Sequence, residues 1–143
     1  MNIFLRHGEV KNPKDILYYN IPGYELSEKG IKQAEHIAEK LKKDFRIEKI
    51  ISSPLLRARQ TSQIVNKMLK KEITFIDEIT EWGGIKNWIG NTTFEIQQSK
   101  EFEIYINDPT ELNTDESFFD TFKRVNKLHE LSLIHISEPT RQP

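Results

Sequence analysis

The sequence predicts a three-layer α/β fold in which a mostly parallel sheet is flanked by helices. Short apolar runs typical of buried strands alternate with segments of helical period, and this alternation is the pattern of parallel strands joined by crossover helices. Unusual polar segments begin where the predicted strands end, which is the edge at which such sheets bind ligands. The 143 residues, 36% of them hydrophobic, suit one domain with a lean core.

Three strands are expected in the first half of the chain. Residues 2–5 form an apolar run that ends at Arg6-His7-Gly8. Residues 47–52 make the second strand, and Ile73 starts the third, which runs to Ile76.

The first helix should begin after Ser27, an N-cap candidate that is followed by Glu28 in the favourable first turn. Apolar residues then repeat at helical spacing as far as Phe45. Gly30 in the first turn costs about 1 kcal/mol relative to Ala, and local propensity does not explain it.

Three further helix starts are indicated along the chain. Ser53-Pro54 is an N-cap followed by proline at the first helical position, and predicts a helix to about Lys71. Residues 92–95 form a capping box for a helix that is broken at residues 107–109. The last helix should begin near Asp115. We interpret its early phenylalanines and both tryptophans as core residues: Phe118, Phe119, Phe122, Trp82 and Trp88.

Residues 12–25 and 77–91 are predicted to be irregular. The first segment holds two prolines, a glycine and three tyrosines, and long loops inside a compact domain are usually binding loops or lids. The second holds both tryptophans and three glycines.

Composition narrows the possible functions. The net charge of −1 gives no basic footprint, so we expect neither nucleic acid nor a membrane as a partner. There is no cysteine and no His-x-x-x-His pair, so no metal and no cofactor are expected. A cytoplasmic location is expected, since the N-terminal apolar run is too short for a signal peptide. The sequence does not indicate the oligomeric state.

Arg6-His7, at the end of the first predicted strand, is a candidate for phosphoryl chemistry. A neutral imidazole is a competent nucleophile, and a guanidinium can hold phosphoryl oxygens bidentately. A histidine that merely ends a strand is the alternative.

Arg57 shares a helix face with Thr61 and Ile64, whereas Arg59 lies on the face of the lysines. We therefore expect Arg57 to point inward and Arg59 toward water. An inward guanidinium needs an anion, which is either a structural carboxylate or a bound phosphate near the helix N-terminus.

Glu81 follows the third predicted strand and stands beside Trp82. A carboxylic acid against an indole can have a raised pKa and serve as a general acid. The alternative is an exposed loop residue, as Asp77 and Glu78 are equally acidic.

Taken together, these segments resemble the histidine phosphatase superfamily, the phosphoglycerate mutase-like proteins. The resemblance covers the chain to about Leu131, and its third stretch is the most specific. Four stretches match in order: Phe4-Leu-Arg-His-Gly-Glu9; Leu26-Ser-Glu-Lys-Gly-Ile-Lys-Gln-Ala34; Ile51-Ser-Ser-Pro-Leu-Leu-Arg-Ala-Arg-Gln-Thr61; and Glu116-Ser117 followed by Arg124.

The resemblance implies a role for each matching residue. His7 would take up the phosphoryl group, Arg6 and Arg57 would form the phosphate pocket, and Glu81 would protonate the leaving oxygen. Asn12 would match an asparagine that touches the phosphate. The implied activity is that of a phosphomonoesterase acting through a phosphohistidine on a small phosphorylated metabolite. A mutase of the same family and a non-catalytic phospho-ligand-binding fragment are the alternatives.

One feature of the family is missing. Its pocket is completed by a second histidine in a Ser/Thr-His-Gly turn, and here the only nearby candidate is His135, followed by Ile136. Residues 132–142 look like translated sequencing-adapter DNA, although a genuine short tail is the alternative. We therefore expect residues 1–131 to be the N-terminal part of a histidine phosphatase domain and 132–143 a non-native tail. The fold would then be incomplete at the C-terminus, and the 143-residue chain weakly active or inactive.

Overall fold

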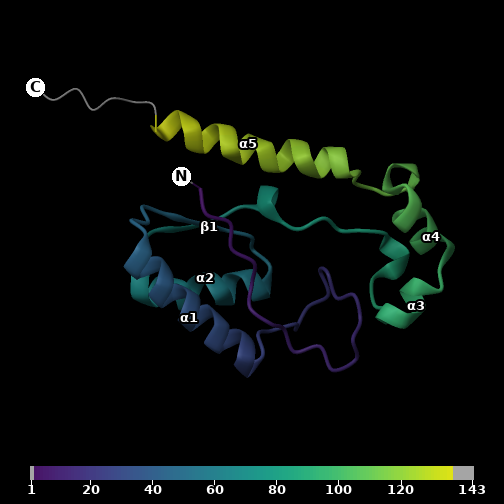
Figure 1. Ribbon diagram of the computed structural model, residues 1–143, viewed down its shortest axis with the longest axis horizontal. Helices are drawn as coiled ribbons and strands as arrows, with labels where there is room; N and C mark the ends of the chain where they lie inside the picture. The colour runs from purple at the N-terminus through teal and green to yellow at the C-terminus, as the bar shows by residue number, and fades with distance from the viewer. Residues whose placement is uncertain (1, 137–143) are drawn as a thin grey trace, which may run out of the picture.

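The computed structural model describes residues 2–136, with side chains for residues 2–128. Helices and strands alternate in the first half, and short helices follow in the second (Figure 1). The elements are α1 (Glu28–Asp44), β1 (Ile50–Ser52), α2 (Leu56–Leu69), β2 (Ile73–Phe75), the 3-10 helices η1 (Asp77–Ile79) and η2 (Lys86–Trp88), α3 (Thr93–Gln97), α4 (Lys100–Asn107), the 3-10 helix η3 (Pro109–Glu111) and α5 (Phe118–Ile136).

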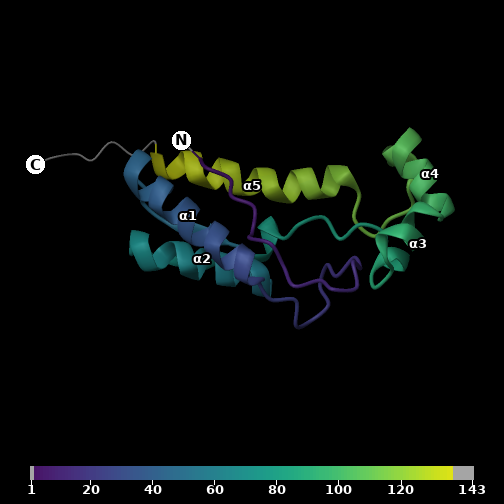
Figure 2. The same ribbon diagram turned by 60° about the horizontal axis from the view of Figure 1, so that its bottom comes forward.

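The sheet is a parallel pair. Ile50 of β1 lies opposite Ile73 of β2, and Ser52 lies opposite Phe75. The path from β1 through α2 to β2 is a crossover connection, as parallel strands require. Figures 1 and 2 show α1 and α2 together on one side of the strands and α5 on the other. The predicted α/β class is confirmed.

The core lies between α1 and α2. Ala38 and Leu41 of α1 meet Val65 of α2, and Ile47 and Ile50 pack partly buried against them. The helical repeat of apolar residues on α1 therefore faces α2. Because Ile50 belongs to β1, this contact also fixes both helices against the sheet and places the start of α2 at the end of β1.

α1 begins as predicted, and the structure explains Gly30. The Ser27 hydroxyl accepts a hydrogen bond from the Gly30 N–H at 3.0 Å. A Cβ on Gly30 would lie 2.0 Å from the carbonyl oxygen of Glu9, and a Cβ on Gly8 would lie 2.4 Å from the carbonyl oxygen of Gly30. Two glycines thus allow the backbone after His7 to lie directly against the first turn of α1.

The expected strand at residues 2–5 is wrong. The structure assigns no strand there, and the side chains of Ile3, Phe4 and Leu5 are exposed. A strand needs a neighbouring ladder for its backbone groups and a covered face for its side chains. Within residues 2–136, β1 pairs only with β2, so this apolar run gains neither.

The expected start of α2 is also wrong. The helix begins at Leu56, with Leu55 as its N-cap residue and no side-chain cap. The Ser53 hydroxyl accepts from the Leu55 N–H at 3.3 Å and lies 3.4 Å from the Thr80 hydroxyl. Ser53 therefore shapes a turn before the helix. The capping box at Thr92 is present as predicted, but the single expected helix is two: α3 ends at Gln97, and α4 begins after its own N-cap residue Ser99 and ends before Pro109.

The interpretation of the late aromatic residues holds only in part. Trp88 is buried and Trp82 half-buried, whereas Phe118, Phe119 and Phe122 are exposed. α5 lies against η1, and this contact leaves Phe118, Phe119 and Phe122 uncovered. The α5 backbone continues past residue 131 to Ile136. The His135 side chain and residues 137–143 of the expected tail lie outside what the structure describes.

Within the described residues, the structure contains no helix that is long and apolar enough to cross a membrane.

We predict that Gly30→Ala destabilises the protein, although alanine normally stabilises a helix. The new methyl group would collide with the Glu9 backbone, so we expect the free energy of unfolding to fall by about 1–3 kcal/mol, as overpacking typically does. Urea denaturation measures it. Lys32→Ala, at an exposed position of the same helix, is the control and should change stability by less than about 0.5 kcal/mol. A stabilised Gly30→Ala variant would contradict the close approach.

Candidate active site

Three of the residues singled out in the sequence meet at the ends of β1 and β2. The Glu81 carboxylate lies between the other two: Oε1 is 3.1 Å from Arg57 Nη2, and Oε2 is 4.0 Å from His7 Nε2. The Arg57 and His7 side chains are only 4% and 14% exposed, while Glu81 is 49% exposed. A half-buried imidazole and a buried guanidinium therefore share one accessible carboxylate.

The His7 ring is oriented by its own backbone. Nδ1 lies 2.8 Å from the carbonyl oxygen of Gly8. A carbonyl oxygen only accepts, so Nδ1 carries the proton and the neutral ring has its lone pair on Nε2. Gly8 is itself held by α2, since its N–H donates to the Thr61 hydroxyl at 3.1 Å. Nε2 thus faces Glu81 from a fixed backbone.

Arg57 is buried in the first turn of α2, as the helical phase predicts, and Arg59 is exposed over the ring of Phe75. Nη1 of Arg57 donates to the Tyr19 carbonyl at 2.8 Å, and its guanidinium carbon lies 5.0 Å from the Tyr18 ring centroid. Nη2 has no hydrogen-bond partner within the described residues. Glu81 is close to it but lies off the direction of an N–H bond. A buried N–H left in this way is costly, and an anion oxygen placed beside it would satisfy it.

Two other expected site residues are not part of this cluster. Arg6 is exposed and lines, with His7 and Thr61, a hollow of about 270 Å³. The Asn12 amide is used inside its own loop, where Nδ2 donates to the Ile16 carbonyl at 2.8 Å and Oδ1 accepts from the Ile16 N–H at 3.1 Å. The structure therefore does not bring Asn12 to His7.

Trp82, the chain neighbour of Glu81, packs against α5. Its ring lies 4.3 Å from that of Phe118, and its Nε1 donates to the Glu116 carbonyl at 2.7 Å. The indole thus belongs to the contact with α5.

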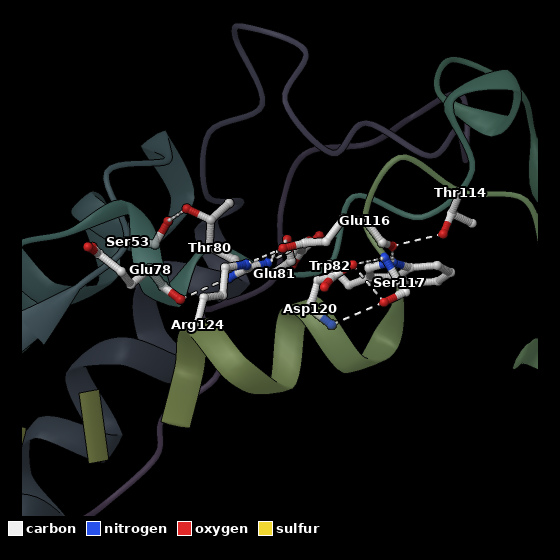
Figure 3. A network of polar contacts seen from close by, with 10 residues as sticks. All are labelled: Ser53, Glu78, Thr80, Glu81, Trp82, Thr114, Glu116, Ser117, Asp120 and Arg124. Atoms are coloured by element: carbon white, nitrogen blue, oxygen red, sulfur yellow. Dashed lines mark hydrogen bonds and ion pairs between the residues drawn. The ribbon is translucent and has the colours of Figure 1, made fainter. Parts of the chain in front are cut away.

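Sequence reasoning did not place two contacts around the site. The loop of residues 12–25, interpreted from the sequence as a binding loop or lid, closes over Arg57. Burial there raises the pKa of Tyr18, and the Arg57 charge opposes this effect. Arg124 of α5 reaches the backbone of residues 78–80, which precede Glu81 (Figure 3). In the sequence, Arg124 is singled out only as part of the fourth stretch that resembles the histidine phosphatase superfamily.

Within the described part of the chain, no group of three or more His, Cys, Asp or Glu side chains could hold a metal ion.

Comparison with known proteins places this geometry in a family. Residues 2–135 match the model of the histidine phosphatase superfamily (branch 1), and the chain therefore belongs to this superfamily.

The relatives include phosphatases and a mutase. An 82-residue segment, 57% of this chain and 40% of the relative, is 40% identical to a 2,3-bisphosphoglycerate-dependent phosphoglycerate mutase of Thermoplasma acidophilum. A mycobacterial glucosyl-3-phosphoglycerate phosphatase, solved with inorganic phosphate, superposes with a TM-score of 0.72 at 25% identity, over 93% of this chain and 61% of that one. A putative α-ribazole-5′-P phosphatase of Escherichia coli gives 0.73 at 23% identity, over 91% and 66%, and shows the shared fold.

The chain is shorter than these relatives. The matched segment spans 40% of the length of the Thermoplasma acidophilum mutase, and the chain spans 61% and 66% of the two solved structures.

We predict that Arg57→Ala weakens the binding of inorganic phosphate far more than Arg59→Ala. Loss of a charged hydrogen bond to a buried anion costs about 2 to 5 kcal/mol, and only Arg57 offers a buried N–H. Calorimetric titration with inorganic phosphate measures the affinity of both variants and of the wild-type protein. Equal effects would show that phosphate does not bind at Arg57.

Proposed function

We propose that this chain carries the phosphoryl-accepting site of a phosphomonoesterase, which acts through a phosphohistidine on a small phosphorylated metabolite. The carrying observation is the convergence of His7 Nε2 and Arg57 Nη2 on one exposed carboxylate, Glu81, with which Nη2 forms an ion pair but no hydrogen bond. A nucleophile, an anion-binding donor and a proton donor are thereby within reach of a single phosphate group.

In the first step, the lone pair on His7 Nε2 attacks phosphorus and the bond from phosphorus to the ester oxygen breaks. Glu81 in its acid form gives its proton to the departing oxygen. Arg57 holds a phosphoryl oxygen through Nη2 and stabilises the charge that develops there. The start of α2 adds its N-terminal dipole to the same anion. Arg6, exposed next to His7, is the second guanidinium that we propose for the phosphoryl oxygens.

In the second step, water attacks the phosphohistidine and Glu81 takes its proton. The bond from phosphorus to Nε2 breaks, and inorganic phosphate and neutral His7 are restored. The Gly8 carbonyl supports both steps, because its bond to Nδ1–H stabilises the positive ring while Nε2 is bonded to phosphorus.

A mutase is the second candidate, and the 40% identity with the Thermoplasma acidophilum mutase favours it. The two activities share the first step and differ in what accepts the phosphoryl group. The mycobacterial relative that binds inorganic phosphate supports the phosphatase.

We predict that the wild-type protein, given 32P-labelled aryl phosphate, forms an acid-labile phosphoenzyme at His7. His7→Ala should abolish the label. His36→Ala, which removes an exposed histidine of α1, should not. Label on a serine, or label that persists in His7→Ala, would contradict a phosphohistidine. Chase of the labelled enzyme with phosphoglycerate separates the candidates, because a mutase passes the label to the sugar acid and a phosphatase releases it as phosphate.

We predict that Glu81→Gln lowers turnover most for substrates with poor leaving groups. An alkoxide needs its proton in the transition state, whereas p-nitrophenolate leaves without one, and general acids contribute about 10²- to 10⁴-fold. Rates for a series of aryl and alkyl phosphates measure the dependence. Glu78→Gln removes a nearby exposed carboxylate as the control. A uniform loss across leaving groups would indicate that Glu81 only assists binding.

A further inference from the structure

We propose that Arg124 is a positioning residue: with Glu116 it forms a latch from α5 that holds the backbone before Glu81 and so aims the Glu81 carboxylate at His7. The inference rests on the proposed function, since it assigns Glu81 the role of proton donor. It adds a residue from the far end of the described chain to a site otherwise built from its first 81 residues.

The Arg124 guanidinium is fully engaged, and Figure 3 shows it between Glu116 and the loop before Glu81. Nε and Nη2 donate to the two oxygens of the Glu116 carboxylate, the second at 2.9 Å. Nη1 donates to the Glu78 carbonyl at 2.8 Å and to the Thr80 carbonyl, and Nη2 also donates to the Glu81 carbonyl at 3.5 Å. One planar group therefore joins a carboxylate on one side to three main-chain oxygens on the other.

Glu116 is the anchor of this latch. The hydrogen bonds from Arg124 hold the pKa of Glu116 below its ordinary value of 4.5, so its carboxylate is charged at neutral pH. Its main-chain carbonyl accepts from Trp82 Nε1 at 2.7 Å. Glu116 thus fixes the residue after Glu81 directly and the residue before it through Arg124.

The loop needs such an external support. Glu81 lies in an irregular segment between η1 and η2 and is followed by Gly83 and Gly84, the latter with φ of +66°. Apart from η1 itself, Thr80 is held on the sheet side by the 3.4 Å contact between its hydroxyl and that of Ser53. The Thr80 carbonyl belongs to the peptide group that leads into Glu81, so a bond to it restrains the rotation that would swing the Glu81 side chain away from Arg57.

The geometry calls for arginine rather than any cation. A guanidinium presents five N–H groups in one plane, which match a carboxylate on one edge and carbonyls on the other. A lysine ammonium keeps the charge but cannot make the paired contacts.

The test uses the wild-type protein and four variants: Arg124→Ala, Arg124→Lys, Glu81→Gln and the double variant Arg124→Ala/Glu81→Gln. Lys127→Ala, which removes an exposed cation from the same helix, is the matched control. Turnover is measured with p-nitrophenyl phosphate and with an alkyl phosphate, because only the second depends on protonation by Glu81. Hydrogen exchange of the peptide covering residues 77–84 reports on the loop without reference to catalysis.

We expect Arg124→Ala to slow the alkyl phosphate about 100-fold and p-nitrophenyl phosphate less than about tenfold, the scale at which a misplaced catalytic group acts. The same selective loss should appear in Arg124→Lys, and the double variant should be no slower than Glu81→Gln alone. Exchange in residues 77–84 should rise in both Arg124 variants and remain unchanged in Lys127→Ala.

Several results would overturn the latch. Equal losses for both substrates, or losses that multiply with those of Glu81→Gln, would mean that Arg124 does not act through Glu81. Full rescue by lysine would reduce its role to charge. If the wild-type protein forms no phosphohistidine, the proposed function fails; the exchange measurement still decides whether Arg124 holds the loop, and unchanged exchange in Arg124→Ala overturns the latch by itself.

Discussion

The approach of one main chain to another at Gly8 and Gly30 is the constraint on which the site depends. His7 has its place because the next residue fits against the first turn of α1, where a side chain on either glycine would collide with backbone. The Gly8 N–H also donates to the Thr61 hydroxyl of α2, and Thr61 lies four residues after Arg57. The α1–α2 core therefore sets the distance between His7 and Arg57, and packing between these helices helps to fix the geometry of the candidate site.

Most of the first half of the fold follows from patterns in the chain, and the exceptions have physical causes. The helical period of α1, the cap at Ser27 and the burial of Arg57 rather than Arg59 are local properties, and the structure confirms them. The strand expected at residues 2–5 fails because a strand is a property of its neighbours, which an apolar run does not reveal. Phe118 and Phe122 fail in the same way, since their exposure depends on what covers α5.

The candidate site shows a similar division. His7 and Arg57 were found from their positions at the end of a predicted strand and on a helix face, and Glu81 from its place after another strand. The contacts that turn these residues toward one another were not predictable, because they involve carbonyl groups, such as those of Gly8, Tyr19 and Thr80. Every residue type carries a carbonyl, so a sequence contains no mark of which one will accept a bond.

The loop that covers Arg57 is attached to a second loop as well as to α2 and α3. The Gly90 N–H donates to the Leu17 carbonyl at 2.8 Å, and the Leu17 N–H donates to the Asn91 carbonyl at 2.9 Å. Ile16 also forms an antiparallel bridge with Thr92. The Tyr19 ring also rests against Gly83, where a Cβ would lie 3.0 Å from it. The two loops therefore support each other's conformation, so substitutions in one loop require matching substitutions in the other. A chimera that takes the first loop from a relative with another substrate would have to take the second loop as well.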